Sequence, residues 1–245
     1  MNKIEADLIK DHINKDGYHC IENYINYEEQ KILRNFVDTK LVENNNQYFF
    51  LTSESSEKTL LHDENFFEKI ESLLKNITQN FGYLNRKNEK LYKVLRVVTG
   101  KKSKKVSLDF HFDAHLLTLL IPIYIPNKTN SDNGNLIIIK NLRKLTHFLI
   151  KNIFQKLFYQ SAFFKKIFIK NNLVKKETLV LKPGNAYIFN GFRTLHANMN
   201  IDPNDVRATI LVHYYDVFKD SFLVKTNRKI RINRELKNIK FNTKK

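Results

Sequence analysis

His111-Phe112-Asp113 is followed 83 residues later by His196, and ten residues then separate His196 from Arg207-Ala208-Thr209. Residues i and i+2 of a β-strand point to the same side, so His-x-Asp on a strand places an imidazole beside a carboxylate. A second imidazole from a neighbouring strand completes a set of two histidines and one carboxylate. This set is typical of non-haem Fe(II) sites that keep open coordination positions. The spacing therefore predicts an iron site at His111, Asp113 and His196.

Arg207 and Thr209 share one side of the strand that follows the distant histidine. A guanidinium group binds a carboxylate through two parallel hydrogen bonds, and a hydroxyl on the same side can assist. We therefore expect this pair to bind a carboxylate close to the metal. His-x-Asp alone is common by chance, whereas the ordered set of both motifs is much rarer.

Three further segments carry a family resemblance: 15–24 (KDGYHCIENY), 181–189 (LKPGNAYIF) and 206–215 (VRATILVHYY). With the predicted ligands, they make the sequence resemble the Fe(II)- and 2-oxoglutarate-dependent dioxygenases of the phytanoyl-CoA hydroxylase-like family. The match covers most of residues 10–220, with a gap in the middle. It departs from the family at Asn185, a turn position where the family usually has Asp.

The resemblance implies an all-β core with helical additions, folded as a double-stranded β-helix of the jelly-roll type. It also implies an enzyme that hydroxylates a C–H bond with Fe(II), 2-oxoglutarate and O₂. By resemblance, His111, Asp113 and His196 bind the iron. Arg207 holds the C5 carboxylate of 2-oxoglutarate with help from Thr209.

Apolar periodicity and turn residues divide the chain into elements. Helices are predicted at 3–15, 27–37 and 64–81, and strands at 18–24, 91–98, 106–113, 116–124, 135–139, 178–181, 186–192 and 207–216. About eight strands fit the barrel that the resemblance implies. We expect one domain over residues 1–245, with a helical part at 1–90, a barrel at 91–218, a helical insert at 142–176 and a basic segment at 219–245.

The insert 142–176 contains nine Lys or Arg residues and no Asp or Glu. Helical spacing relates five of its apolar residues: Leu142, Leu145, Leu149, Ile153 and Leu157. A basic amphipathic helix rich in Phe is typical of a membrane-surface element. A lid helix that packs its apolar side on the barrel is the alternative, and the sequence leaves both open.

Charge is unevenly distributed, because residues 1–90 carry a net −4 and residues 91–245 a net +21. This asymmetry favours an anionic partner. Cys20 is the only cysteine, which excludes an internal disulfide and favours a reducing cytosol. We expect a cytoplasmic protein and, if the insert binds lipid, a peripheral place on the inner face of the membrane. Nothing in the sequence indicates the oligomeric state.

The segment 193–198 (RTLHAN) and the position of the basic insert are similar to Kdo hydroxylases, which oxidise the sugar acid of lipopolysaccharide. This resemblance implies an anionic, lipid-linked substrate. A CoA ester or another small metabolite is the alternative within the enzyme class. A non-catalytic basic barrel that binds lipid or nucleic acid is the alternative outside it. The absence of Trp and the scarcity of Arg argue against nucleic acid.

Some residues near the predicted ligands have open roles. On a straight strand, Asp109 and His115 would share the side of His111, so Asp109 with His111 is an alternative ligand pair. We expect His115 to lie behind the ligands or beside the substrate, and His213 to be a hydrogen-bonded core histidine. Arg96 is a candidate for binding the co-substrate or an anionic substrate, or for a structural ion pair.

Overall fold

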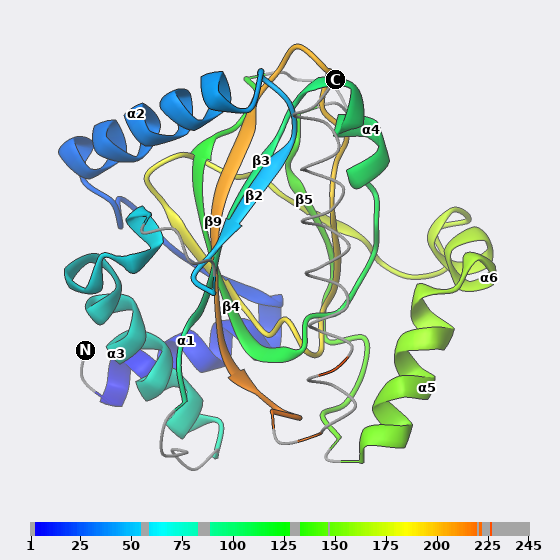
Figure 1. Ribbon diagram of the computed structural model, residues 1–245. Coiled ribbons are helices and arrows are strands. Elements are labelled where there is room, and N and C mark those ends of the chain that lie inside the picture. The colour runs from blue at the N-terminus through cyan, green and yellow to red at the C-terminus, as the bar shows by residue number, and fades with distance from the viewer. Residues whose placement is uncertain are drawn as a thin grey trace.

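The computed structural model describes residues 3–54, 59–82, 89–127, 133–146, 148–219, 221 and 226, and shows two antiparallel β-sheets (Figure 1). The larger sheet has the order β1-β7-β4-β9-β3-β2. Its strands are β1 (Tyr18–Ile21), β2 (Phe49–Thr52), β3 (Tyr92–Val98), β4 (His115–Tyr124), β7 (Ala186–Phe189) and β9 (Arg207–Asp216). The smaller sheet, in the order β6-β5-β8, contains β5 (Leu136–Ile139), β6 (Glu177–Leu179) and β8 (Leu195–Asn198).

The two sheets pack face to face through apolar side chains. Leu120 on β4 and Phe189 on β7 belong to one buried cluster with Leu136 and Ile138 on β5. Because both sheets contribute to this cluster, they form the two walls of a flattened barrel. The predicted all-β core with helical additions is therefore confirmed.

Strand β9 is buried on both sides, and its alternation separates two environments. Ala208, Ile210 and Val212 belong to the core beneath the N-terminal helices. Arg207 and His213 face the space between the sheets, where they line a cavity. The strand therefore carries packing residues on one side and polar groups on the other, as a period of two requires.

Three helices cover the outer side of the larger sheet, away from β5: α1 (Lys3–Asp16), α2 (Tyr27–Glu43) and α3 (Glu64–Asn80) (Figure 1). Helix α2 begins at a capping box, in which Asn26 accepts from the Glu29 amide and the Glu29 carboxylate accepts from the Asn26 amide. Helix α3 buries Phe67, Ile70, Leu74 and Ile77 against the sheet. The three predicted helices are confirmed, although α2 continues six residues beyond the predicted end at residue 37.

The insert between β5 and β6 contains α5 (Leu149–Gln160), α6 (Ala162–Phe164) and a π-helical turn, η3 (Lys165–Ile169). Figure 1 shows α5 and α6 projecting on the far side of β5 from the larger sheet. The predicted helix is present but begins at Leu149, because residues 141–146 follow β5 as turn and coil.

The strand predicted at 106–113 is wrong. A 3-10 turn, η2 (Gly100–Lys102), and a short helix, α4 (Ser103–Val106), precede it and end at its first residue, and Leu108 has a left-handed φ of 55°. Only His111 pairs with a neighbour, in an isolated bridge to His196. Residues 106–113 therefore alternate like a strand in sequence, but apart from His111 they pair with no neighbouring strand among the described residues.

Strands β2 and β8 were not predicted. Each is four residues long, and although β8 (LHAN) alternates apolar and polar residues, four positions are too few for a periodic signal. The basic segment expected at 219–245 lies outside the described residues, apart from Lys219, Ser221 and Thr226.

Candidate metal and carboxylate site

His111 and His196 are held together by their backbones. In the isolated bridge, the His111 amide donates to the His196 carbonyl at 3.0 Å, and the His111 carbonyl accepts from the His196 amide at 3.1 Å. The two imidazoles lie on the same side, with ring centroids 4.5 Å apart. Although 85 positions separate the two histidines in sequence, one pair of backbone hydrogen bonds places their rings side by side.

Asp113 reaches the two histidines from a loop. Its amide donates to the Gly191 carbonyl at 2.9 Å, and its Oδ2 accepts from the Thr118 hydroxyl at 2.5 Å. A side chain at Gly191 would overlap both the Asp113 carboxylate and the Thr118 hydroxyl. The carboxylate is thus fixed by a hydroxyl donor on β4 and by the glycine that leaves room for it.

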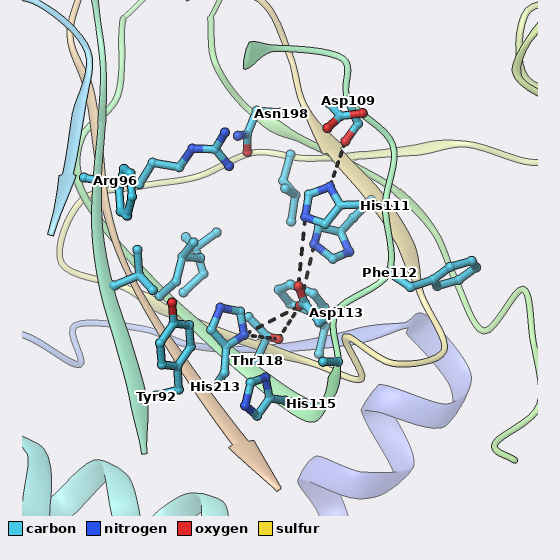
Figure 2. A pocket seen from close by; sticks show the side chains of 18 of the residues that line it. Tyr92, Arg96, Asp109, His111, Phe112, Asp113, His115, Thr118, Asn198 and His213 are labelled. Atoms are coloured by element: carbon cyan, nitrogen blue, oxygen red, sulfur yellow. Dashed lines mark hydrogen bonds and ion pairs between the residues drawn. The ribbon is translucent and has the colours of Figure 1, made fainter. Parts of the chain in front are cut away.

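The three side chains form the only cluster of potential metal ligands found among the described residues, with their ligand atoms within 4.8 Å of one another. His111 Nε2 lies 3.9 Å from Asp113 Oδ1, and His196 Nε2 lies 3.7 Å from Asp113 Oδ2. Figure 2 shows His111 and Asp113 facing each other across this gap. Two imidazole nitrogens and one carboxylate converge, as a facial triad requires.

Hydrogen bonds select the histidine tautomer that suits a metal. His111 Nδ1 lies 2.7 Å from the Asp109 carbonyl, and His196 Nδ1 lies 3.0 Å from the Thr194 carbonyl. A carbonyl oxygen only accepts, so each Nδ1 carries the proton and each Nε2 keeps its lone pair. Backbone carbonyls orient metal-binding histidines in this way in many metalloproteins. The donor set therefore fits a divalent transition metal.

Protonation states also suit metal binding. Burial and the neighbouring His196 lower the pKa of His111 to about 4, so its imidazole is neutral at pH 7. For Asp113, burial favours the neutral acid. The adjacent His196, His213 and His111 and the Thr118 hydroxyl outweigh it, and they hold the pKa well below its usual range. Neutral imidazole and ionised carboxylate are the forms that bind a metal.

Arg207 is a buried cation in the same cavity, with only 1% of its surface exposed. Its Nε donates to the Gly134 carbonyl at 2.7 Å, and Nη1 donates to the Thr209 hydroxyl at 3.3 Å. Nη2 is buried and has no hydrogen-bond partner among the described residues. Burial and the nearby Arg96 lower the pKa of Arg207 to about 9, as expected for a guanidinium without a counterion. A carboxylate in the cavity would complete its hydrogen bonding.

Gly134 makes room for this arginine. Its φ is +69°, and a side chain there would overlap the Arg207 and Ile201 side chains. This position therefore favours glycine for two reasons: its backbone is left-handed, and a Cβ would not fit.

The cavity has a volume of about 490 Å³ and opens between the two sheets and the insert. Arg96 on β3 and Lys156 on α5 line it together with the predicted ligands. Arg96 Nε is buried without a hydrogen-bond partner, and none of the described carboxylates pairs with it. In Figure 2 its guanidinium points into the cavity toward Asn198 and His111. The structural ion pair considered for Arg96 is therefore absent within the described part of the chain.

His115 and His213 form a stack of rings with Tyr92 beside the triad. Their ring centroids lie 5.2 Å apart, and that of Tyr92 lies 5.8 Å from His115 and 5.9 Å from His213. His213 Nδ1 is 3.1 Å from the Thr118 hydroxyl and 3.7 Å from Asp113 Oδ2. Both histidines line the cavity and are outside the ligand cluster.

Asp109 does not join the cluster. Its carboxylate is exposed and lies 3.5 Å from Lys165 Nζ, while its carbonyl accepts from His111. The straight-strand argument that placed Asp109, His111 and His115 on one side is therefore wrong, because this segment turns at Leu108.

Sequence reasoning missed Thr118, Gly191 and Gly134, which position the ligands and the arginine. Thr118 sits in an otherwise apolar strand, LLTLLIPI, and a lone hydroxyl in such a run is a usable signal. Gly191 and Gly134 are two of only six glycines in the chain, so each is informative. Their partners, however, are distant in sequence.

No protein-family model matches the sequence, and no curated protein matches it either. Solved structures resemble the fold. A prolyl-4-hydroxylase from Pseudomonas putida has a TM-score of 0.54 over 86% of this chain and 98% of that chain, at 6% identity. A prolyl hydroxylase from Trichoplax adhaerens, in complex with a hypoxia inducible factor peptide, has a TM-score of 0.56 over 87% and 90%, at 12% identity.

The epimerase SnoN from nogalamycin biosynthesis, solved with Fe³⁺ and α-ketoglutarate, has a TM-score of 0.55 over 88% of this chain and 85% of that chain, at 11% identity. At these identities the likeness shows the fold alone, and that fold is the double-stranded β-helix predicted from the sequence. None of these three structures is a phytanoyl-CoA or Kdo hydroxylase, so that finer resemblance stays a prediction.

Proposed function

We propose that this protein is an Fe(II)- and 2-oxoglutarate-dependent dioxygenase that hydroxylates a C–H bond of an anionic substrate. One observation carries the proposal. The convergent ligands His111, Asp113 and His196 line the same cavity as Arg207, whose buried Nη2 has no partner. A metal site and a carboxylate site in one cavity are what a chelating keto acid with a distal carboxylate needs. The fold is shared with solved enzymes of this kind.

Each side chain has a distinct role in this proposal. His111, Asp113 and His196 would hold the metal, and Thr118 would keep the Asp113 carboxylate in its binding orientation. Arg207 and Thr209 would bind the C5 carboxylate of 2-oxoglutarate, which supplies the hydrogen-bond acceptor that Arg207 lacks. When bound, Fe(II), 2-oxoglutarate and O₂ supply the oxidising power for C–H hydroxylation. The protein positions these groups and excludes water.

The anionic character of the substrate is inferred from two further cations. Once Arg207 is occupied, Arg96 on β3 and Lys156 on α5 still line the cavity. Of the two carboxylates that line it, Asp113 is committed to the metal and Asp109 lies near Lys165. The substrate end of the cavity is therefore positive, and a carboxylate or phosphate would be attracted there.

Kdo linked to lipid is our first substrate candidate, because a sugar acid offers the carboxylate that Arg96 and Lys156 would recognise. The sequence resemblance to Kdo hydroxylases points in the same direction. A CoA ester is the second candidate, since its phosphates would use the same cations. We treat residues 1–245 as one catalytic unit.

Mass spectrometry of reaction mixtures tests this function. The protein is incubated with Fe(II), 2-oxoglutarate and O₂, and with either Kdo-bearing lipid or an acyl-CoA ester. Formation of succinate, together with a product heavier by one oxygen atom, is expected from one of them. The Asp113→Ala variant should give neither. If the protein binds metal and 2-oxoglutarate but forms no succinate with either substrate, the non-catalytic barrel is favoured.

A further inference from the structure

Helix α5 is oriented with its polar side toward the protein and its apolar side toward solvent. Asn152 is buried, and Lys156 and Gln160 line the cavity. The apolar residues recur at helical spacing on the opposite side and are exposed, as is Phe163 of α6. We call this set the outer insert face: Ile150 (71% exposed), Ile153 (41%), Phe154 (68%), Leu157 (66%), Phe158 (48%) and Phe163 (60%).

The orientation of α5 is held by buried contacts on its inner side. Arg143 is stacked between Phe112 and Phe192, with its guanidinium carbon 4.1 and 4.0 Å from their ring centroids. Its Nη1 donates to Asn152 Oδ1 at 2.7 Å, and its Nε donates to the Phe192 carbonyl at 2.6 Å. The polar side of α5 is thereby tied to the loop between β7 and β8.

Apolar contacts fix the end of the insert. Phe164 and Ile169 are buried in one cluster with Ile139 and Leu195 of the smaller sheet. The insert therefore has its own anchors on the barrel. The lid interpretation, in which the apolar side of the helix packs on the barrel, does not hold for the outer insert face.

A contiguous apolar surface of this kind marks an interaction site. Lys151 precedes Phe154 and Phe158 by three and seven positions, and Lys166 and Lys170 follow Phe163 by three and seven. Lys151 therefore lies beside Phe154 and Phe158 on α5, and the exposed Lys166 and Lys170 lie on the turns that follow Phe163. With no acidic residue anywhere in 142–176, the whole surface is positive.

We propose that the outer insert face docks on an anionic lipid surface. The proposal rests on the proposed function, because it would bring a lipid-linked anionic substrate to the cavity. A second copy of this chain would present the same lysines and be repelled. An amphipathic helix with Phe and Leu on one side and Lys beside them is typical of helices that bind in a lipid interface. Among the described residues, no helix is long and apolar enough to cross a membrane.

Docking in this orientation would place the cavity beside the lipid surface. The same helix exposes Phe154 and Leu157 outward and directs Lys156 toward the cavity. A headgroup carboxylate or phosphate at the surface would then lie within reach of the cation that enters the cavity. One side of α5 would therefore contact the membrane, and the other side would face the substrate in the cavity.

Vesicle cosedimentation of the full chain tests the proposal. Vesicles of phosphatidylcholine with phosphatidylglycerol should bind the protein at low salt, and vesicles of phosphatidylcholine alone should bind it at least tenfold less. High salt should weaken the binding, since the attraction of lysines to an anionic leaflet is screened. The double variant Phe154→Gln/Leu157→Gln and the triple variant Lys151→Gln/Lys166→Gln/Lys170→Gln should each lower binding at least tenfold.

Matched controls come from the opposite side of the molecule. Ile32 and Val42 on α2 are as exposed as the tested residues, at 64% and 73%, so Ile32→Gln/Val42→Gln should bind as wild type does. Lys31, Lys69 and Lys75 on α2 and α3 are exposed, and their triple Gln variant removes the same charge. If both triple variants lose binding equally, overall charge is responsible and the outer insert face is not.

Two outcomes overturn the proposal: wild-type protein that stays in the supernatant with anionic vesicles at low salt, and outer-face variants that bind as wild type does. Self-association that the Phe154/Leu157 variant abolishes, in protein that does not bind vesicles, would make a second copy the occupant. Metal-dependent binding of 2-oxoglutarate, measured on the same preparations, separates the two proposals. If 2-oxoglutarate binds but vesicles do not, only the membrane-docking proposal is rejected. If vesicles bind but 2-oxoglutarate does not, only the proposed dioxygenase function is rejected.

Discussion

The backbones of His111 and His196 exchange two hydrogen bonds, of 3.0 and 3.1 Å, and form an isolated β-bridge. The predicted metal site therefore depends on backbone pairing for the position of its two imidazoles. Both Nδ1 atoms are also occupied by backbone carbonyls. Removing a side chain from this site should leave the pairing in place.

Alanine variants of the predicted ligands follow from this arrangement. His111→Ala, Asp113→Ala and His196→Ala should each abolish Co(II) and Fe(II) binding, because a facial triad that loses a ligand keeps too few donors. Circular dichroism should show a folded protein in each case. Isothermal titration with Co(II) provides the measurement, with His115→Ala as a control that retains binding. Loss of binding in His115→Ala but not in His111→Ala would show that His115, and not His111, is the ligand.

The hydroxyl of Thr118 should matter for metal affinity, because it donates to Asp113 Oδ2. Thr118→Val keeps the volume and removes the donor, so the Kd for Co(II) should rise about 10–100-fold. Thr118→Ser keeps the donor and should bind within a few-fold of wild type. Equal affinities for the Val and Ser variants would show that the carboxylate is positioned by other contacts.

Gly191 should tolerate no side chain while the metal is bound. In Gly191→Ala, the added methyl would overlap the Asp113 carboxylate and the Thr118 hydroxyl. The carboxylate must then rotate, and we expect metal affinity to fall at least as far as in Thr118→Val. Titration with Co(II) and a thermal melt distinguish this from unfolding. Wild-type affinity in Gly191→Ala would contradict the close approach.

Arg207 should control the affinity for 2-oxoglutarate. Arg207→Ala leaves the C5 carboxylate without its charged partner, at a cost of about 2–5 kcal/mol. The apparent KM for 2-oxoglutarate should therefore rise at least tens-fold while metal binding persists. Arg96→Gln is the matched control, since it removes the other buried guanidinium of the cavity, and it should leave this KM nearly unchanged. The reverse result would exchange the roles of the two arginines.

The parts of the site that were predictable come from regular elements. Arg207 and Thr209 lie two apart on a ten-residue strand, so their spacing alone predicted that they share one side. Helix α3 was predictable for the same reason, because its apolar period extends over more than four turns.

Other parts depend on contacts that no local pattern encodes. Asp109, His111 and Asp113 alternate like a strand, but the left-handed Leu108 and the lack of a pairing edge make them a loop. Arg143 resembled one more exposed basic residue of the insert, whereas it is buried between two rings. In the same way, the amphipathic period of α5 did not indicate which side faces the protein.

The most direct test of the central claim is the anaerobic titration of 2-oxoglutarate into the protein with and without Fe(II). We expect weak binding to the metal-free protein. We expect at least tenfold tighter binding with Fe(II), because the keto acid then meets both the metal at His111, Asp113 and His196 and the guanidinium of Arg207. Equal affinity with and without Fe(II), or no binding under either condition, would contradict the proposed function.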